Sequence, residues 1–291
     1  MYGMYRSGLA AMRLKKLTLL RKLLQFLAFL ICNPFLSNFQ AGRLYTGKWK
    51  NFCSPGLNCH SCPAAAFACP IGAMQAVGGS ARFNFSFYVT GFILAIGLIF
   101  GRAVCAFLCP FGLVQELLHR IPSPKIRLPR LFRYLKYAIL IVFVLIMPVA
   151  DTNYAGIGDP SFCKYICPSG SLGAGIPLLL SHPELRAVLG VLFSVKTAVL
   201  LIVLLASVFI SRFFCRVICP LGALYGLTNR LSLLHIELDS NRCISCGCCA
   251  SYCPMDLNPV KESSSCECIR CINCVSSCPH KAIRLHLGKS V

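Results

Sequence analysis

The chain has 291 residues, of which 56% are hydrophobic and only 13% are charged, and its formal net charge is +20. Soluble domains carry about 25% charged residues, so this composition indicates a membrane protein and argues against an ordinary soluble domain. The 21 cysteines would suit a disulfide scaffold in a short secreted chain, but this chain is not short and we expect no signal peptide.

Four segments are apolar and long enough to cross a hydrocarbon core of about 30 Å, which takes about 20 residues. In chain order they cover residues 19–38, 83–101, 134–150 and 190–210. The first lacks the small-residue cleavage site of a signal peptide, so we expect it to persist as a span. The predicted fold is therefore mainly α, with a four-helix transmembrane bundle over residues 1–235.

Basic residues are distributed unevenly between these spans. Of the 29 lysines and arginines, seven lie in residues 102–136 and nine in 211–291, against four in 42–82 and two in 151–190. Because cytoplasmic loops carry the excess of Lys and Arg, we expect a multi-pass protein of the cell (inner) membrane with both termini in the cytoplasm. Topology and contact with the lipid bilayer then explain the charge, and we expect no nucleic-acid partner.

A C-P-x-G motif occurs four times between residues 69 and 222. The copies start at Cys69, Cys109, Cys167 and Cys219, and the last three extend backward to C-x3-C-P. The predicted topology places the copies alternately outside and inside, so each half of the bundle carries one outer and one inner copy. This recurrence indicates an internal duplication with pseudo-twofold symmetry.

The C-terminal segment, residues 236–291, contains the pattern C-x2-C-x2-C-x3-C-P twice, as CISCGCCASYCP and CIRCINCVSSCP. Bacterial two-cluster ferredoxins bind 4Fe–4S clusters with this spacing, and the fourth cysteine of each motif ligates the other cluster. One cluster is expected on Cys243, Cys246, Cys249 and Cys278, and the second on Cys268, Cys271, Cys274 and Cys253. Zinc also binds C-x2-C pairs, but the doubled pattern favours a small α+β ferredoxin domain. It leaves Cys32, Cys248 and Cys266 without a role.

The two inner C-x3-C-P motifs supply Cys105 and Cys109 from one half and Cys215 and Cys219 from the other. The i, i+4 spacing places both cysteines of a motif on one helix face, and two such faces meeting at the pseudo-twofold axis would form a cage of four thiolates. Disulfides are disfavoured in a reducing cytoplasm, so we expect a third cluster here. The alternative is that these cysteines pack as small hydrophobic residues.

Six cysteines fall on the predicted outer side: Cys53, Cys59, Cys62, Cys69, Cys163 and Cys167. Four of them could hold a fourth cluster, with Cys53 the least certain member. Two clusters with additional non-cysteine ligands, or disulfides alone, are the other interpretations that the residues leave open. A c-type haem is excluded, because proline stands where C-x-x-C-H requires histidine.

The paired C-x3-C-P motifs at span ends, followed by a two-cluster tail, resemble the membrane polyferredoxins of the NapH, MauN and NosR type. The resemblance covers about residues 80–291. Those proteins are quinol-dehydrogenase and electron-transfer subunits that serve periplasmic reductases. The resemblance therefore implies an electron-transfer subunit of an oxidoreductase complex rather than a stand-alone enzyme, and it makes a flavoprotein partner plausible on either face.

We therefore expect electrons to move across the membrane between a cytoplasmic ferredoxin or reductase and an outer-face redox protein. Exchange with the quinone pool is an alternative, with proton carriers at Gln115, Glu116 and His119, or at Gln75 and His60, although these positions also fit ordinary interfacial helices. A thiol–disulfide relay and a passive assembly subunit are further alternatives. Lys196, inside the fourth span, is expected to extend toward the outer surface.

Overall fold

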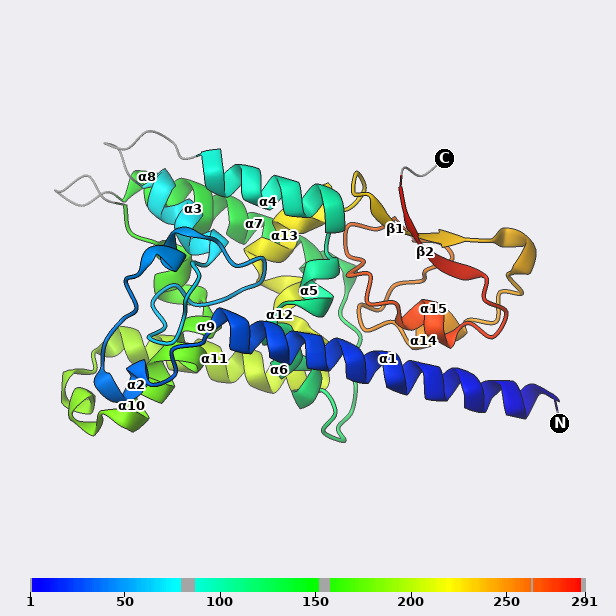
Figure 1. Ribbon diagram of the computed structural model, residues 1–291, viewed down its shortest axis with the longest axis horizontal. Coiled ribbons are helices and arrows are strands. Elements are labelled where there is room, and N and C mark those ends of the chain that lie inside the picture. The colour runs from blue at the N-terminus through cyan, green and yellow to red at the C-terminus, as the bar shows by residue number, and fades with distance from the viewer. Residues whose placement is uncertain (1, 80–86, 152–157, 263, 289–291) are drawn as a thin grey trace.

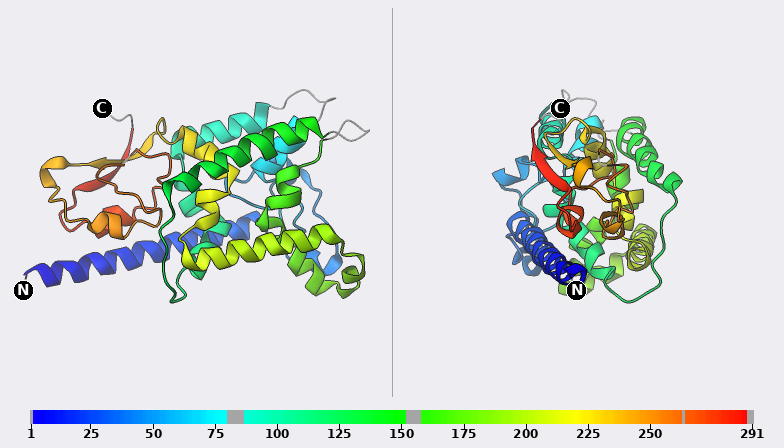
Figure 2. Two further views of the ribbon diagram at one scale, coloured as in Figure 1. Left: turned by 180° about the vertical axis from the view of Figure 1, so that it is seen from behind. Right: turned by 90° about the vertical axis from the view of Figure 1, so that its right-hand side faces the viewer.

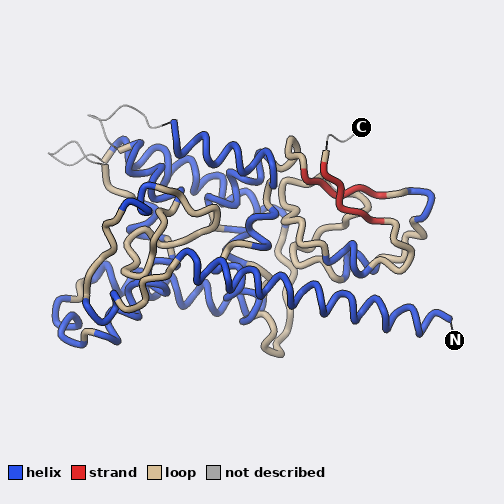
Figure 3. The backbone as a smooth tube through the Cα atoms, in the orientation of Figure 1, coloured by secondary structure: helices blue, strands red, loops and turns tan. Residues whose placement is uncertain are grey.

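The computed structural model describes residues 2–79, 87–151, 158–262 and 264–288, and most of these are helical (Figures 1 and 3). The first half contains α1 (Tyr2–Cys32), α2 (Asn38–Ala41), η1 (Lys48–Asn51), α3 (Pro70–Gly78), α4 (Phe87–Phe100), α5 (Ala103–Phe107), α6 (Pro110–Leu118), η2 (Arg130–Tyr134), α7 (Leu135–Ile139), η3 (Leu140–Ile146) and α8 (Met147–Ala150). The second half contains η4 (Phe162–Ile166), α9 (Pro168–Gly170), η5 (Ser171–Gly175), α10 (Ile176–Ser181), η6 (Pro183–Val188), α11 (Val191–Phe209), α12 (Phe213–Val217) and α13 (Pro220–Thr228). The C-terminal part contains β1 (Leu234–Leu238), η7 (Ser240–Arg242), α14 (Cys248–Ser251), α15 (Asn273–Ser277) and β2 (Ile283–Leu287).

Each C-P-x-G copy begins a helix, and its proline is the reason. The prolines are the first residues of α3, α6, α9 and α13. Proline fits the first helical position and keeps the residue before it extended. Cys109 accordingly has φ −82° and ψ 114°.

The prediction that Cys105 and Cys109 share one helix face is wrong, because Cys105 lies in α5 and Cys109 caps α6. The same break separates Cys215 in α12 from Cys219.

Among the described residues, two helices are long and apolar enough to cross a membrane. They are Arg130–Ala150, formed by η2 to α8, and Val191–Phe209. They agree with two of the four predicted spans. Helix α4 is apolar but has 14 residues, and positions 83–86 of its predicted span lie outside the described residues. Helix α1 ends at Cys32, earlier than predicted, because Pro34 cannot continue a helix.

From Leu19 onward, helix α1 buries polar side chains and exposes apolar ones. Arg21, Gln25 and Cys32 are buried. The side chains that it exposes include Leu19, Leu20, Leu23, Phe26, Leu27 and Ile31. The helix runs from beside α15 along α6 (Figures 1 and 2). Large contiguous apolar surface is rare on soluble monomers, so this face of α1 is a candidate interaction surface, although α1 is not one of the two candidate spans.

The C-terminal part is a compact loop structure closed by a two-stranded antiparallel sheet. Strands β1 and β2 pair from Leu234 with Leu287 to Leu238 with Ile283, so the predicted boundary after residue 235 falls inside β1. Met255 and Ile269 of this part belong to the same hydrophobic core as Val104 and Phe214 of the helical part. The two parts are therefore packed together and share one core.

Candidate iron–sulfur sites

Two sets of four cysteines lie in the C-terminal part, and each set lines one cavity. The distal set consists of Cys243, Cys246, Cys249 and Cys278. The proximal set consists of Cys253, Cys268, Cys271 and Cys274. Each set thus takes three thiols from one motif and the fourth from the other, which is the crossed arrangement that the spacing predicts. Cys248 also lines the distal cavity.

The two motifs follow the same backbone path. Ser245 and Arg270, which precede the second cysteine of each motif, have φ of 53° and 49°. Gly247 and Ile272, which follow it, have φ of 73° and 56°. Non-glycine residues rarely adopt positive φ, so its occurrence at matched positions shows that both loops curl tightly around their cavities.

The inner set consists of Cys105, Cys109, Cys215 and Cys219, which line a single cavity. All four are buried. Two come from each half of the helical part, as predicted, although they belong to four separate elements. Four thiols around one enclosed cavity fit the ligand requirement of a 4Fe–4S cluster.

Two arginines hold the inner halves together reciprocally. Arg102 donates from Nη2 to the carbonyl oxygen of Cys215 at 3.2 Å. Arg212 donates from Nη1 to the carbonyl oxygen of Cys105 at 2.9 Å. Both arginines are fully buried. Each half therefore uses its arginine to hold the first cysteine of the other half, and two fixed positive charges lie beside the four thiols.

The C-P-x-G spacing has a direct structural explanation. The amide N–H of Gly222 donates to Cys219 Sγ at 3.4 Å. The glycine amides of the other three copies act on their cysteine sulfurs in the same sense, but without a capping hydrogen bond. The Cys219 sulfur therefore occupies the place of an N-capping oxygen. A Cβ at Gly112 would lie 3.2 Å from the carbonyl oxygen of Cys105, so glycine also permits the close approach of the neighbouring segment.

On the predicted outer side, four of the six cysteines converge. This outer set consists of Cys59, Cys69, Cys163 and Cys167, whose thiols lie within electrostatic range of one another. A Cβ on Gly170, in the Cys167 copy, would lie 3.5 Å from Cys59 Sγ. A Cβ on Gly72, in the Cys69 copy, would lie 3.9 Å from Cys163 Sγ. The two halves of the helical part therefore contact each other at the outer set as well as at the inner set.

The remaining cysteines have other neighbours. Cys62 contacts the carbonyl oxygen of Gly173 at 3.2 Å, and Cys32 lies 3.5 Å from the Ser54 hydroxyl. Cys53 is buried near Cys69, with its backbone paired to that of Ala68. Cys266 contributes its carbonyl oxygen to Arg102. All 21 cysteines lie within the described residues and are free thiols.

One segment, Ser54–Asn58, separates the inner and outer sets, and sequence reasoning missed it. The amide N–H of Leu57 contacts Cys109 of the inner set, and the amide N–H of Asn58 contacts Cys69 of the outer set. The hydroxyl of the fully buried Tyr225 donates to the carbonyl oxygen of Pro55 at 3.0 Å. Two successive amides of one segment therefore contact both cysteine sets.

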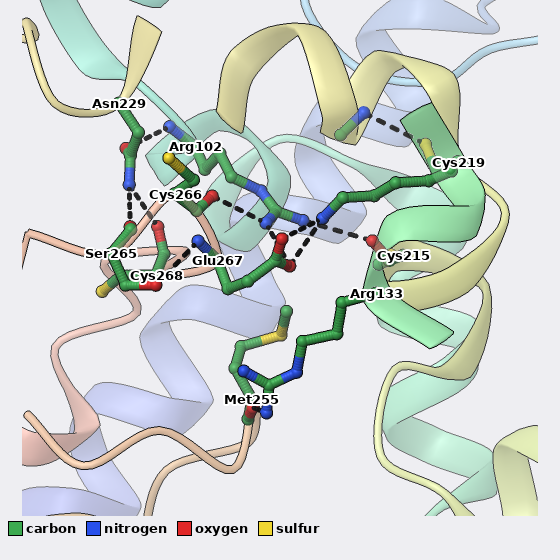
Figure 4. A network of polar contacts seen from close by, with 12 residues as sticks. Arg102, Arg133, Cys215, Cys219, Asn229, Met255, Ser265, Cys266, Glu267 and Cys268 are labelled. Atoms are coloured by element: carbon green, nitrogen blue, oxygen red, sulfur yellow. Dashed lines mark hydrogen bonds and ion pairs between the residues drawn. The ribbon is translucent and has the colours of Figure 1, made fainter. Parts of the chain in front are cut away.

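A buried ionic network joins the ferredoxin part to the helical part (Figure 4). Glu267, which precedes Cys268 of the proximal set, accepts from Arg102 at 2.9 Å and from the buried Lys136. Arg216 pairs with Asp256 at 2.6 Å. Burial alone would raise the pKa of Glu267, but Arg102 and Lys136 outweigh it and hold this pKa low. The network therefore fixes the proximal set against the inner set.

Burial makes several of the thiols poor nucleophiles. Burial raises the pKa of Cys167 to about 12 and that of Cys253 to about 11. Reactive cysteines have lowered pKa values and are accessible, whereas metal binding replaces the thiol proton with a cation. These environments therefore favour metal ligation over the thiol–disulfide relay.

The residues considered as proton carriers have defined structural contacts. Glu116 pairs with Arg21 at 2.8 Å and with Arg212 at 2.6 Å, and these arginines outweigh its burial and keep its pKa low. Burial lowers the pKa of both His60 and His119. Glu116 is therefore the anion of a buried ion-pair network, and burial favours the neutral form of both histidines.

Lys196 lies near the outer set, on the side toward which it is expected to extend. Its side chain is half-buried and its charge acts on Cys59 of the outer set. A cation beside a thiolate ligand stabilises the negative charge of that ligand.

The described residues thus form four sets of four cysteines, all with the donor chemistry of 4Fe–4S sites. This combination of fold and sites defines a polyferredoxin, a protein with several iron–sulfur clusters.

Comparisons with known proteins agree with this class. A family described as "4Fe-4S binding domain" matches residues 85–129, 137–181 and 197–238. The putative electron transport protein YccM of Escherichia coli is 30% identical over 199 residues, which is 64% of this chain and 51% of YccM. The methylamine utilization ferredoxin-type protein MauN of Paracoccus denitrificans is 29% identical over 169 residues, covering 55% of this chain and 52% of MauN.

An uncharacterised protein of Methanocaldococcus jannaschii is 30% identical over 60% of this chain and 61% of its own length. The chain thus spans between half and two thirds of the length of these relatives. No solved structure matches. The chain is similar to the 4Fe–4S polyferredoxins of the NapH and MauN type, and its cofactors are multiple 4Fe–4S clusters.

Proposed function

We propose that this chain conducts electrons across the cell membrane, using four 4Fe–4S clusters held by the distal, proximal, inner and outer sets. Each bound cluster would accept and release single electrons without bond breaking. The direction would follow the relative potentials, which burial and hydrogen bonds to sulfur set. A ferredoxin or reductase would exchange electrons at the cytoplasmic end, and a redox protein, such as a flavoprotein, at the outer end.

The observation that carries this proposal is the contact of Ser54–Asn58 with both helical sets. Leu57 reaches Cys109 and the next residue, Asn58, reaches Cys69. A hydrocarbon core of about 30 Å is too thick for one useful electron jump, so a path needs adjacent stations. Helices α5 and α12, with Cys105 and Cys215, lie between the ferredoxin part and helices α3 and α9 (Figure 1). The four sets therefore form a series along the molecule.

The exposed apolar surface supports placing this series in the bilayer. Leu201, Ile202 and Leu205 of α11 are more than half exposed, as are several leucines of α1. In this proposal α1, α4, the helix Arg130–Ala150 and α11 are the four spans, and both termini are cytoplasmic. The protein would then act as an electron-transfer subunit of a membrane oxidoreductase complex.

A second candidate function, exchange of electrons with the quinone pool, is favoured by one cavity. This cavity has a volume of about 640 Å³ and is mostly apolar, with Phe26, Phe29, Phe111 and Cys59 among its lining residues. Pockets for small molecules typically measure 300–1,000 Å³ and carry few polar groups. Asn58 also lines it, and its Nδ2 is buried without a hydrogen-bond partner among the described residues. Menaquinol or ubiquinol should then reduce the purified protein; no reduction by either would exclude this function.

The first test is the iron and acid-labile sulfide content of the anaerobically purified protein. Four clusters correspond to about 16 irons per chain. We expect this value for the unaltered protein and a loss of about four irons in the Cys163→Ser/Cys167→Ser double variant. The matched control, Cys62→Ser, should lose none. About eight irons in the unaltered protein would leave only the ferredoxin sets loaded and would overturn the proposal.

Conduction itself is tested in proteoliposomes. A membrane-impermeant reductant outside should reduce a trapped electron acceptor when the unaltered protein is present. The Cys163→Ser/Cys167→Ser variant should abolish this transfer while its ferredoxin clusters still become reduced. Undiminished transfer by the double variant would show that the outer set is not on the electron path.

A further inference from the structure

Two buried glutamines occupy equivalent positions in the inner and outer sites. The first two C-P-x-G copies extend to C-P-x-G-x-x-Q, as CPIGAMQ and CPFGLVQ, and end at Gln75 and Gln115. Both side chains are fully buried. They lie on α3 and α6, the helices that Cys69 and Cys109 cap.

Each glutamine contacts the opposite half of its site in the same way. Gln115 donates from Nε2 to Cys215 Sγ at 3.2 Å, and its Oε1 accepts from the amide N–H of Phe214 at 3.0 Å. Gln75 donates from Nε2 to Cys163 Sγ at 3.4 Å, and its Oε1 accepts from the amide N–H of Phe162 at 3.0 Å.

The local chemistry fixes the orientation of each side-chain amide. A backbone N–H needs an acceptor, so the glutamine oxygen must face the phenylalanine and the NH₂ group must face the sulfur. Nε2 also donates to the carbonyl oxygen one turn earlier, at 3.3 Å in both cases. Each glutamine is thereby held by its own helix and by the segment it contacts, and one N–H remains directed at the ligand sulfur.

We propose that Gln75 and Gln115 are positioning residues that set the reduction potentials of the outer and inner clusters separately. A hydrogen bond to a thiolate ligand favours the more negative, reduced form of the cluster, so it raises the potential. Glutamine suits this task because it supplies a donor without adding charge, while its oxygen satisfies the buried amide. The inference rests on the ligand sets of the proposed function but not on electron conduction.

The test is a potentiometric titration of the purified protein followed by EPR. Gln115→Leu should shift the midpoint potential of the inner cluster downward and leave the outer one unchanged, and Gln75→Leu should do the reverse. We expect the ratio of reduced to oxidised cluster at a fixed potential to fall on the order of tenfold, or ~59 mV for one electron. Gln115→Glu and Gln75→Glu keep an acceptor for the phenylalanine amide but remove the donor, so they should shift the same potentials downward.

Gln25 supplies a matched control. It is a buried glutamine whose Nε2 donates to the carbonyl oxygen of Cys109, at 3.4 Å, rather than to a sulfur. Gln25→Leu should leave both potentials unchanged. Unchanged potentials in the glutamate variants, or equal shifts of both clusters in each variant, would overturn the proposal. Low iron in the unaltered protein would instead show that the ligand assignment had failed.

Discussion

At the scale of single residues, Glu267 determines how tightly the ferredoxin part is held. Its carboxylate lies between Arg102 and Lys136, and the side chains of both bases are fully buried. Removing one partner of a buried ion pair costs about 3–5 kcal/mol, because the remaining charge is left uncompensated. This one carboxylate neutralises two buried cations. Its loss should therefore reduce the stability of the protein more than the loss of an exposed carboxylate would.

We predict that Glu267→Gln lowers the melting temperature of the detergent-solubilised protein by roughly 10 °C. Glu262→Gln is the control, because Glu262 pairs with Arg130, whose side chain is 81% exposed, and exposed pairs contribute about 0–1 kcal/mol. Differential scanning fluorimetry under anaerobic conditions measures both variants. Equal melting temperatures for the two variants would contradict the role given to Glu267.

At the scale of elements, the segment Ser54–Asn58 depends on a glycine. Gly56 lies against the inner site, where an added Cβ would be 3.1 Å from both the Cα of Cys109 and the carbonyl oxygen of Leu108. Both neighbours are backbone atoms, so they cannot rotate away. A larger residue must therefore displace the segment that contacts the inner and outer sets.

Gly56→Ala should destabilise the protein by about 1–3 kcal/mol, which is typical of overpacking, and should reduce the iron bound at the inner site. Gly78→Ala is the matched control, because a Cβ at Gly78 would meet no atom within 4 Å. Chemical denaturation and iron content measure the two effects. Iron content and stability equal to those of the control would show that the segment has room to move.

At the scale of the whole molecule, the start of α1 and the end of β2 lie toward the same end, beside the ferredoxin part (Figures 1 and 2). The outer set lies beyond the inner set from that end. If the long axis crosses the membrane, both termini and the ferredoxin part lie on one side. This placement is compatible with an even number of spans.

Reporter fusions test this topology. Alkaline phosphatase fused after residue 288 should be inactive, because that enzyme needs an oxidising compartment to form its disulfides. The same reporter fused after residue 46, between α1 and the outer set, should be active. High activity of the C-terminal fusion would contradict the cytoplasmic placement of the ferredoxin part.

The sequence by itself determined the features that depend on the spacing of residues close together in the chain. The crossed ferredoxin sets follow from two short motifs, and the helix starts follow from prolines that fix the residue before them. The pairing of Cys105 and Cys109 with Cys215 and Cys219 also follows from the repeat. Two of the predicted spans agree with helices of sufficient length.

Only the tertiary structure decided which outer cysteines meet. Cys59 and Cys69 lie near the second-half thiol of Cys167. The equally well spaced Cys62 instead contacts the backbone carbonyl oxygen of Gly173. The contacts of Gln75 and Gln115 with sulfur likewise join residues about a hundred positions apart in the chain. Spacing along the chain determines which residues meet only within one loop or helix. Contacts between distant segments depend on how the helices pack. They cannot be read from the sequence, because the same residue pattern fits several packings.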